Sequence, residues 1–167
     1  MMQKKQCLQV VNLIFLSLLL TACGFHLRGA ANLPDGYQSV YIDGQGPFGT
    51  QLGELLSYSN ATVVKARSDA DVIIHIISDN KQRRDLSLSR GGKSTELELT
   101  RVILYELLDA EGIVLLPEQK LEMVRNYYND QTGVIGKGNE EAQIYQEMNR
   151  QMAGRLLRQI RVVLEAK

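Results

Sequence analysis

Three cationic side chains fall in segments that the sequence predicts to be loops, where they could bind phosphate. Arg90 and Lys93 flank the pair Gly91 and Gly92, and Lys137 lies in a glycine-rich segment before the last predicted helix. Arginine pairs with phosphate through two parallel hydrogen bonds, and lysine contributes a point charge. The alternative is that these cations only keep exposed turns soluble, and composition alone favours that interpretation.

The residues that most often perform catalysis or bind metal are scarce. The chain has two histidines, His26 and His75, and two cysteines, without the spacing of a zinc site. A G-x-S-x-G nucleophile elbow is absent. The segment Arg90–Ser94 resembles the end of a P-loop, but Ser87 stands where glycine is needed and a strand is predicted to follow. We therefore expect no enzymatic activity, no metal and no cofactor, and a packed, hydrogen-bonded His75.

Cys23 is predicted to carry a lipid. A basic start precedes an apolar run over residues 8–20, which is shorter than the roughly 20 residues of a membrane-spanning helix. Such a run is typical of a secretory signal peptide. It ends in Leu20-Thr21-Ala22-Cys23, which resembles the bacterial lipobox, and a thiolate is the nucleophile that thioether formation needs. Residues 1–22 are therefore predicted to be removed, and Cys23 to anchor the protein.

Charge and aromatic content exclude nucleic acid as a partner. The 19 Lys and Arg residues equal the 19 Asp and Glu residues, whereas a nucleic-acid binder needs an excess of cations. With no Trp, seven Tyr and three Phe, a stacking platform for single strands is not expected. We expect a tether over residues 23–36 and one globular domain over residues 37–167, which is long enough to bury a core without disulfides or metals.

The domain is predicted to be α+β, with two helices packed on a four-stranded mixed sheet in the order strand, helix, three strands, helix. Pro47 suits the first position of a helix over residues 48–59. The first strand and the second, on either side of this helix, are predicted to be parallel. The second strand is longer than usual, so a long protruding hairpin is expected. The predicted strands are 37–42, 72–89, 95–108 and 121–128, with at most a short extended piece at 62–64.

Two further patterns predict the arrangement of the hairpin and of the last helix. Alternation across the glycine pair predicts Leu88 opposite Thr95 and Leu86 opposite Leu97. The last helix is predicted to begin near Asn139, a good capping residue. Its apolar residues recur at helical spacing, so they form one stripe that should pack on the sheet: Ile144 or Tyr145, Met148, Met152, Leu156, Ile160 and Val163 or Leu164.

The segment that follows the lipobox resembles one known family. Cys23-Gly-Phe-His-Leu-Arg28 is similar to the C-G-[FW]-H-L-R opening of the LptE family of lipopolysaccharide-assembly lipoproteins. The S-x-S-R-G-G segment at 87–92, the Lys137-x-Asn139-Glu140 segment and the order of elements are also similar to that family. In bacterial lipoproteins, glycine rather than aspartate after the lipidated cysteine favours delivery to the outer membrane.

The resemblance implies an outer-membrane lipoprotein that forms a complex with the LptD β-barrel. It would lie largely inside that barrel as a plug, assist the folding of the barrel, and help to place lipopolysaccharide in the outer leaflet. The resemblance also implies direct binding of lipopolysaccharide through Arg90 and Lys137. We add Lys93, beside the same turn as Arg90, to these candidate residues.

A hypothesis of a different class stays open at this point. The chain could be a lipid-anchored periplasmic binding module of the cell envelope that is unrelated to lipopolysaccharide. That hypothesis predicts no stable barrel partner and a ligand in a cleft, and a pocket containing acids with shifted pKa values would favour it.

Overall fold

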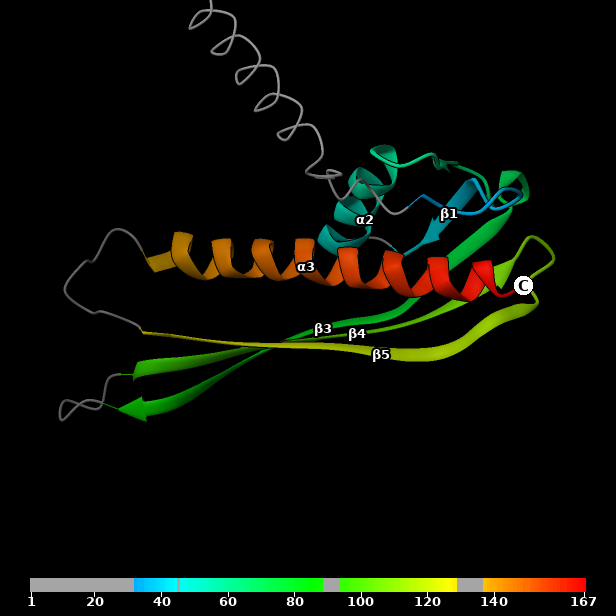
Figure 1. The fold of residues 1–167 in the computed structure, drawn as a ribbon. Helices are drawn as coiled ribbons and strands as arrows, with labels where there is room; N and C mark the ends of the chain where they lie inside the picture. Colours follow the sequence, from blue (N-terminus) through cyan, green and yellow to red (C-terminus); the bar gives the residue numbers. More distant parts are fainter. Residues whose placement is uncertain (1–31, 45, 89–93, 129–136) are drawn as a thin grey trace, which may run out of the picture.

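The computed structural model describes residues 32–44, 46–88, 94–128 and 137–167. These residues form one α+β unit, which confirms the predicted fold class (Figure 1). The order of elements agrees with the prediction apart from one additional strand. The elements are β1 (Ser39–Asp43), α2 (Pro47–Ser57), β2 (Thr62–Val63), the 3₁₀ turn η1 (Arg67–Asp69), β3 (Val72–Leu88), β4 (Ser94–Asp109), β5 (Val114–Tyr128) and α3 (Lys137–Glu165).

The sheet has five strands in the order β2-β1-β3-β4-β5, and so the predicted count of four is wrong by one. β1 is parallel to both of its neighbours, which confirms the predicted parallel pair of β1 and β3. The fifth strand, β2, consists of Thr62 and Val63. The amide of Thr62 donates to Gln38 O at 2.7 Å and the amide of Val64 to Val40 O at 2.9 Å. Two residues are too few to show a period in the sequence.

The β3–β4 hairpin is long, as predicted, with strands of 17 and 16 residues. Its predicted register is wrong near the turn, because Asp85 lies opposite Leu97, Ser87 opposite Glu96 and Leu88 opposite Ser94. Leu86 is an extra residue on β3, and the register shifts again before Leu88. A β-bulge sets two residues against one, and a period-two pattern does not reveal where this occurs.

β5 begins at Val114, well before the predicted start at Leu121, and it contains Pro117. Proline lacks the amide hydrogen that a ladder needs, and so it is confined to edge strands and strand starts. β5 is the edge strand of the sheet, so one side of it needs no donor. Pro117 would be incompatible with a central strand, but it is compatible with the edge strand β5.

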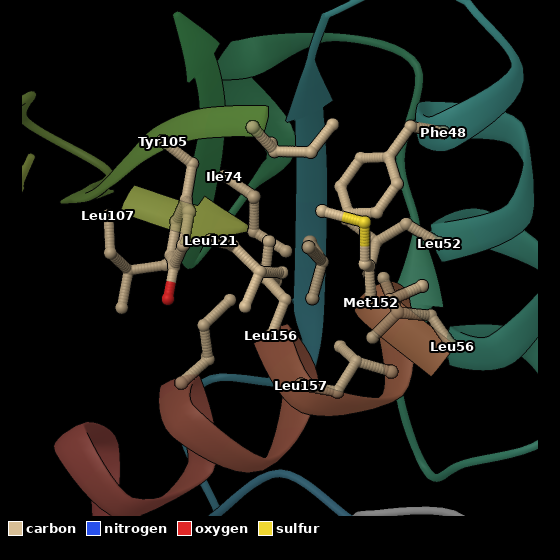
Figure 2. Packing of buried hydrophobic residues seen from close by; sticks show 14 of the residues in the cluster. Phe48, Leu52, Leu56, Ile74, Tyr105, Leu107, Leu121, Met152, Leu156 and Leu157 are labelled. Carbon is tan, nitrogen blue, oxygen red and sulfur yellow. The ribbon is translucent and has the colours of Figure 1, made fainter. Parts of the chain in front are cut away.

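The core lies between the sheet and the two helices, which occupy the same side of β3, β4 and β5 (Figure 1). Figure 2 shows Met152, Leu156 and Leu157 of α3 between Leu52 and Leu56 of α2 and the side chains of the sheet. The predicted apolar stripe is confirmed by the α3 residues that are fully or almost fully buried: Met148, Met152, Leu156, Ile160 and Leu164. The same rotation of α3 also buries Ala153 and Leu157.

The buried hydroxyl of Tyr105 on β4 makes stability depend on pH at the alkaline end. It donates a hydrogen bond to Gln159 Oε1 of α3 at 2.8 Å, and burial raises the pKa of Tyr105 from 10.0 to about 12. Because the folded pKa lies above the unfolded value, this stabilisation is complete below pH 10 and is lost as the pH rises towards 12.

We therefore expect the free energy of unfolding to fall between about pH 10 and about pH 12, with Tyr105 contributing about 2–3 kcal/mol to the fall. Urea unfolding across this range measures it. Tyr105→Phe should remove that part of the alkaline loss, whereas the exposed Tyr128→Phe should keep it. An unchanged alkaline loss in Tyr105→Phe would contradict the assignment.

Candidate functional site

The residues predicted to carry function lie mostly outside the described part of the chain. Cys23, Arg90 and Lys93 fall in residues 1–31 and 89–93, which are outside it. Lys137 is the first residue of α3, but its side chain is also outside the described part. The predicted lipidation site and lipopolysaccharide-binding residues therefore stay predictions.

The described strands and α3 show where the segments containing the predicted cations start and end. Leu88 pairs with Ser94 across the hairpin, and Glu96 pairs with Tyr128 at the end of β5. Tyr127, beside it, donates a hydrogen bond to Glu141 in the first turns of α3 at 3.4 Å. The chain therefore enters and leaves both predicted cation segments at the same end of the sheet.

The outer half of β3 carries a row of cations that the sequence analysis did not single out. Arg83 pairs with Glu141 of α3 at 3.4 Å, and Arg84 pairs with Glu98 of β4 at 3.0 Å. Lys81 Nζ lies 4.9 Å from the centroid of the Tyr145 ring, a cation–π contact. Since consecutive strand residues face opposite sides, Lys81 and Arg83 face α3, and Arg84 faces away. The signal in the sequence was the run Lys81-Gln-Arg-Arg84, which contains three cations within a predicted strand.

Burial and nearby charges raise the pKa values of two tyrosines at this end of the protein, Tyr127 and Tyr145. Burial is the main cause that raises the pKa of Tyr127, and the nearby Glu141 carboxylate raises it further, while Arg83 opposes the rise. The same main cause raises the pKa of Tyr145, again with Glu141 in support. Arg101 and Arg83 lower the pKa of Tyr145 in turn. Both hydroxyls therefore remain neutral hydrogen-bond donors at physiological pH.

An ion pair between β4 and β3 is buried behind the cationic row. The side chain of Arg101 is completely buried, and its Nε donates to Asp79 Oδ1 at 2.8 Å. Nη2 of Arg101 donates to the second carboxylate oxygen. The guanidinium lies 5.6 Å from the centroid of the Phe48 ring, at the start of α2. In the sequence, the apolar residues that follow Arg101 do not indicate that the arginine side chain itself is buried.

Two smaller predictions can be compared with the structure. His75 Nδ1 lies 2.8 Å from Glu106 Oε1, so its predicted hydrogen bond is confirmed, but 37 % of its side chain is exposed and it is not packed in the core. β4 begins at Ser94, so the strand that was predicted, and not the helix that a P-loop requires, follows this segment. Within the described ranges, no cluster of three or more His, Cys, Asp or Glu side chains could hold a metal ion. None of the helices among these residues has the length and hydropathy of a membrane-spanning segment.

The fold is the architecture of a class of small α+β bacterial lipoproteins of known structure. The solution structure of an uncharacterized lipoprotein B from Nitrosomonas europaea is 29% identical, with a TM-score of 0.72, over 86% of this chain and 94% of that one. The crystal structure of rare lipoprotein B from Shewanella oneidensis shares the fold, with a TM-score of 0.62 and 23% identity over 73% of this chain and 92% of that one.

Sequence comparison assigns the family. The model of the LptE family, described as lipopolysaccharide-assembly, matches residues 37–160. The LPS-assembly lipoprotein LptE of Photorhabdus laumondii is 28% identical over 159 residues, which are 93% of this chain and 86% of the relative. The protein of the same name from Pectobacterium atrosepticum is 26% identical over 87% of this chain and 80% of its own length. The chain belongs to the LptE family, and this membership supports a role in lipopolysaccharide assembly.

The buried ion pair gives a prediction for stability. Asp79→Ala would leave the guanidinium of Arg101 buried without its carboxylate, so we expect the free energy of unfolding to fall by about 3–5 kcal/mol. Glu98→Ala is the matched control, because it removes the partner of Arg84, whose side chain is 70 % exposed, and it should cost about 0–1 kcal/mol. Urea denaturation measures both, and equal losses in the two variants would contradict the prediction.

Proposed function

We propose that this protein is an outer-membrane lipoprotein, anchored through Cys23, that forms a complex with the LptD β-barrel. It acts as a plug and assembly factor of that barrel, binds lipopolysaccharide, and helps to deliver it to the outer leaflet. The observation that carries the proposal is the match of the LptE family model to residues 37–160. Arg90, Lys93 and Lys137 are the proposed lipopolysaccharide-binding residues.

The uncovered face of the sheet supports the position inside a barrel. Residues paired across β3, β4 and β5 share a face, and on the outer half of the sheet those that face away from the helices are largely polar. Nearer β1 the same face carries the buried Ile73 and Leu108. The lumen of a membrane β-barrel is polar as well, so the polar groups of this sheet face can find hydrogen-bond partners there. The polar residues of this face include Gln82, Arg84, Glu98, Thr100, Glu122 and Asn126.

The end of the sheet where Leu88 pairs with Ser94 and Glu96 pairs with Tyr128 supports the proposed binding of lipopolysaccharide. The hairpin that contains Arg90 and Lys93 and the segment that leads to Lys137 both start from this end, where β3 already carries Arg83 and Arg84. Phosphate groups form strong charge-assisted hydrogen bonds with arginine and lysine. Both arginines of β3 are paired with carboxylates, and the proposal therefore assigns the ligand to Arg90, Lys93 and Lys137 rather than to these two.

The first experiment is a pull-down of the lipidated protein in mild detergent, followed by mass spectrometry. We expect a large outer-membrane β-barrel in stoichiometric amount. Recovery of the lipoprotein alone in several mild detergents would contradict the complex and would favour the periplasmic binding module.

The second experiment tests the ligand. Arg90→Asp with Lys137→Asp should weaken lipopolysaccharide binding at least about tenfold, because each charge-assisted hydrogen bond contributes about 1.5–3 kcal/mol. Lys65→Asp, an exposed reversal on the loop that follows β2, is the matched control and should bind normally. Equal affinity of the double variant and the control would refute the assignment of these residues.

A further inference from the structure

The outer half of β3 has an open edge. β1 pairs with β3 only from Val72 to His75, and among the described residues no other strand continues this pairing. β4 lies along the opposite side of β3 over its whole length. Between Ile77 and Arg84, the backbone groups of β3 that point away from β4 therefore have no neighbouring strand, and β3 is an edge strand there.

The departure of the chain at the end of β1 leaves this edge open. A Cβ on Gly44 would lie 2.6 Å from Ile76 Cβ, so the chain lies directly against β3 up to this point. α2 then begins at Pro47 and continues on the helix side of the sheet. In the described part of the chain, no strand occupies the position where an extension of β1 would pair with β3.

A groove lies beside the open edge, where the first turn of α2 meets the first half of α3. Its volume is about 450 Å³, and a neighbouring hollow of about 290 Å³ shares Pro47, Gln146 and Asn149 with it. Ligand pockets in proteins commonly measure about 300–1,000 Å³. The groove reaches β3 at Lys81, and its other lining residues are Glu141, Ala142 and Tyr145.

A backbone oxygen of the open edge is already bonded from the groove side. The hydroxyl of Tyr145 donates a hydrogen bond to Gln82 O at 3.2 Å. The ring of Tyr145 also lies against Lys81, with Nζ 4.9 Å from the ring centroid. A side chain of α3 thus supplies a donor of the kind that a neighbouring strand supplies elsewhere in a sheet. The edge of β3 and the groove therefore form one continuous surface.

A buried side chain of the groove lacks a hydrogen-bond donor. Asn149 of α3 is only 5% exposed, yet its Oδ1 has no hydrogen-bond partner among the described residues. A buried acceptor without a partner destabilises the protein unless another molecule donates to it. The missing partner is an N–H or O–H group, since an anion has no hydrogen to give.

Another asparagine of this chain shows how such a side chain holds extended backbone. Asn60 Oδ1 accepts a hydrogen bond from the amide of Leu33 at 2.8 Å. Its Nδ2 donates to Leu33 O at 2.9 Å. One side-chain amide thereby satisfies both backbone groups of one residue. Asn149 has the same two groups, and its Oδ1 is available for a backbone N–H.

The charges along the edge indicate which kind of strand fits. Lys81, Arg83 and Arg84 are all exposed. Arg83 and Arg84 are paired with carboxylates, whereas no carboxylate of the described residues pairs with Lys81. A second copy of this edge would place like charges opposite each other, which is unfavourable. A strand with acidic side chains has the complementary charge.

We propose that the open edge of β3 and the groove bind an extended, acidic segment of another protein, which adds a strand to the sheet beyond β1. The backbone of this segment pairs with β3 between Ile77 and Arg84, and one of its N–H groups donates to Asn149 Oδ1. Its acidic side chains on the helix side lie near Lys81. A polypeptide backbone supplies donors and acceptors at the repeat that a strand edge requires. The inference does not rest on the proposed barrel complex.

The test is a titration of the full-length, ¹⁵N-labelled protein in mild detergent with a blocked peptide of alternating glutamate and valine. We expect saturable shifts of the Asn80 and Gln82 amide signals, with a dissociation constant on the order of 1 mM. Two further peptides are N-methylated at every glutamate or at every valine. Successive N–H groups of a strand point to opposite edges, so one of these two peptides should lose binding and the other should keep it.

Two variants test the side chains, each with a matched control. Lys81→Gln and Asn149→Ala should each weaken binding of the unmethylated peptide at least about threefold, because each removes a polar contact to the peptide. Lys65→Gln and Asn126→Ala make the corresponding changes at exposed positions outside the groove, and they should bind as the parent protein does. The dispersion of the other amide signals checks that every variant is folded.

Three results would overturn the proposal. These are the absence of saturable shifts at Asn80 and Gln82, equal binding by the two methylated peptides, and binding like that of the parent by Lys81→Gln or Asn149→Ala. Shifts of the same amides by lipopolysaccharide but not by the peptide would also overturn it, in favour of a lipid ligand. A failed pull-down of the barrel would contradict the proposed complex but leave peptide binding intact.

Discussion

The packing of one apolar stripe of α3 on β3, β4 and β5 determines most of the remaining structure. Met148, Met152 and Leu156 are completely buried against the sheet and against α2. This contact fixes the rotation of α3, and thereby directs Glu141 and Tyr145 towards the cationic row of β3. It also assigns the two faces of the sheet, one to the core and the other to solvent or to a partner. Removal of the stripe would therefore affect both the core and the surfaces at a distance from it.

The pair formed by Arg101 and Asp79 has a different role within this arrangement. A buried ion pair contributes little net stability, because the cost of removing both charges from water offsets their attraction. Its geometry is demanding, however, since the guanidinium must meet the carboxylate of β3 and lie against Phe48 of α2 at the same time. The pair thus links three elements at the place where the helix-facing residues of β3 change from apolar to polar, while those of β4 stay apolar.

Within the architecture of this LptE-family protein, the two ends of the molecule differ in structure and in proposed role. β1, β2 and α2 gather at one end of the sheet, while the β3–β4 hairpin extends away from them (Figure 1). The extended end leads into the segments that contain the proposed lipopolysaccharide-binding residues. A groove where α2 meets α3, lined by Pro47, Lys81 and Asn149 among others, lies between this end and the compact one. A single long helix connects the three regions, because α3 runs from Lys137 to Glu165 beside all of them.

The sequence alone determined the α+β class, the order of the main elements and the buried face of α3, because each of these produces a local or periodic pattern. Cys23, Arg90, Lys93 and Lys137 were also selected from the sequence, and the motif that surrounds Cys23 indicated the family. The tertiary structure decided the two-residue strand β2, the bulges of the hairpin and the burial of Arg101. These depend on which residues meet across strands and between layers, and a residue's type and its neighbours in the chain do not specify such contacts. The groove of α2 and α3 is of the same kind, since Lys81 and Asn149 approach each other only after the helix has packed on the sheet.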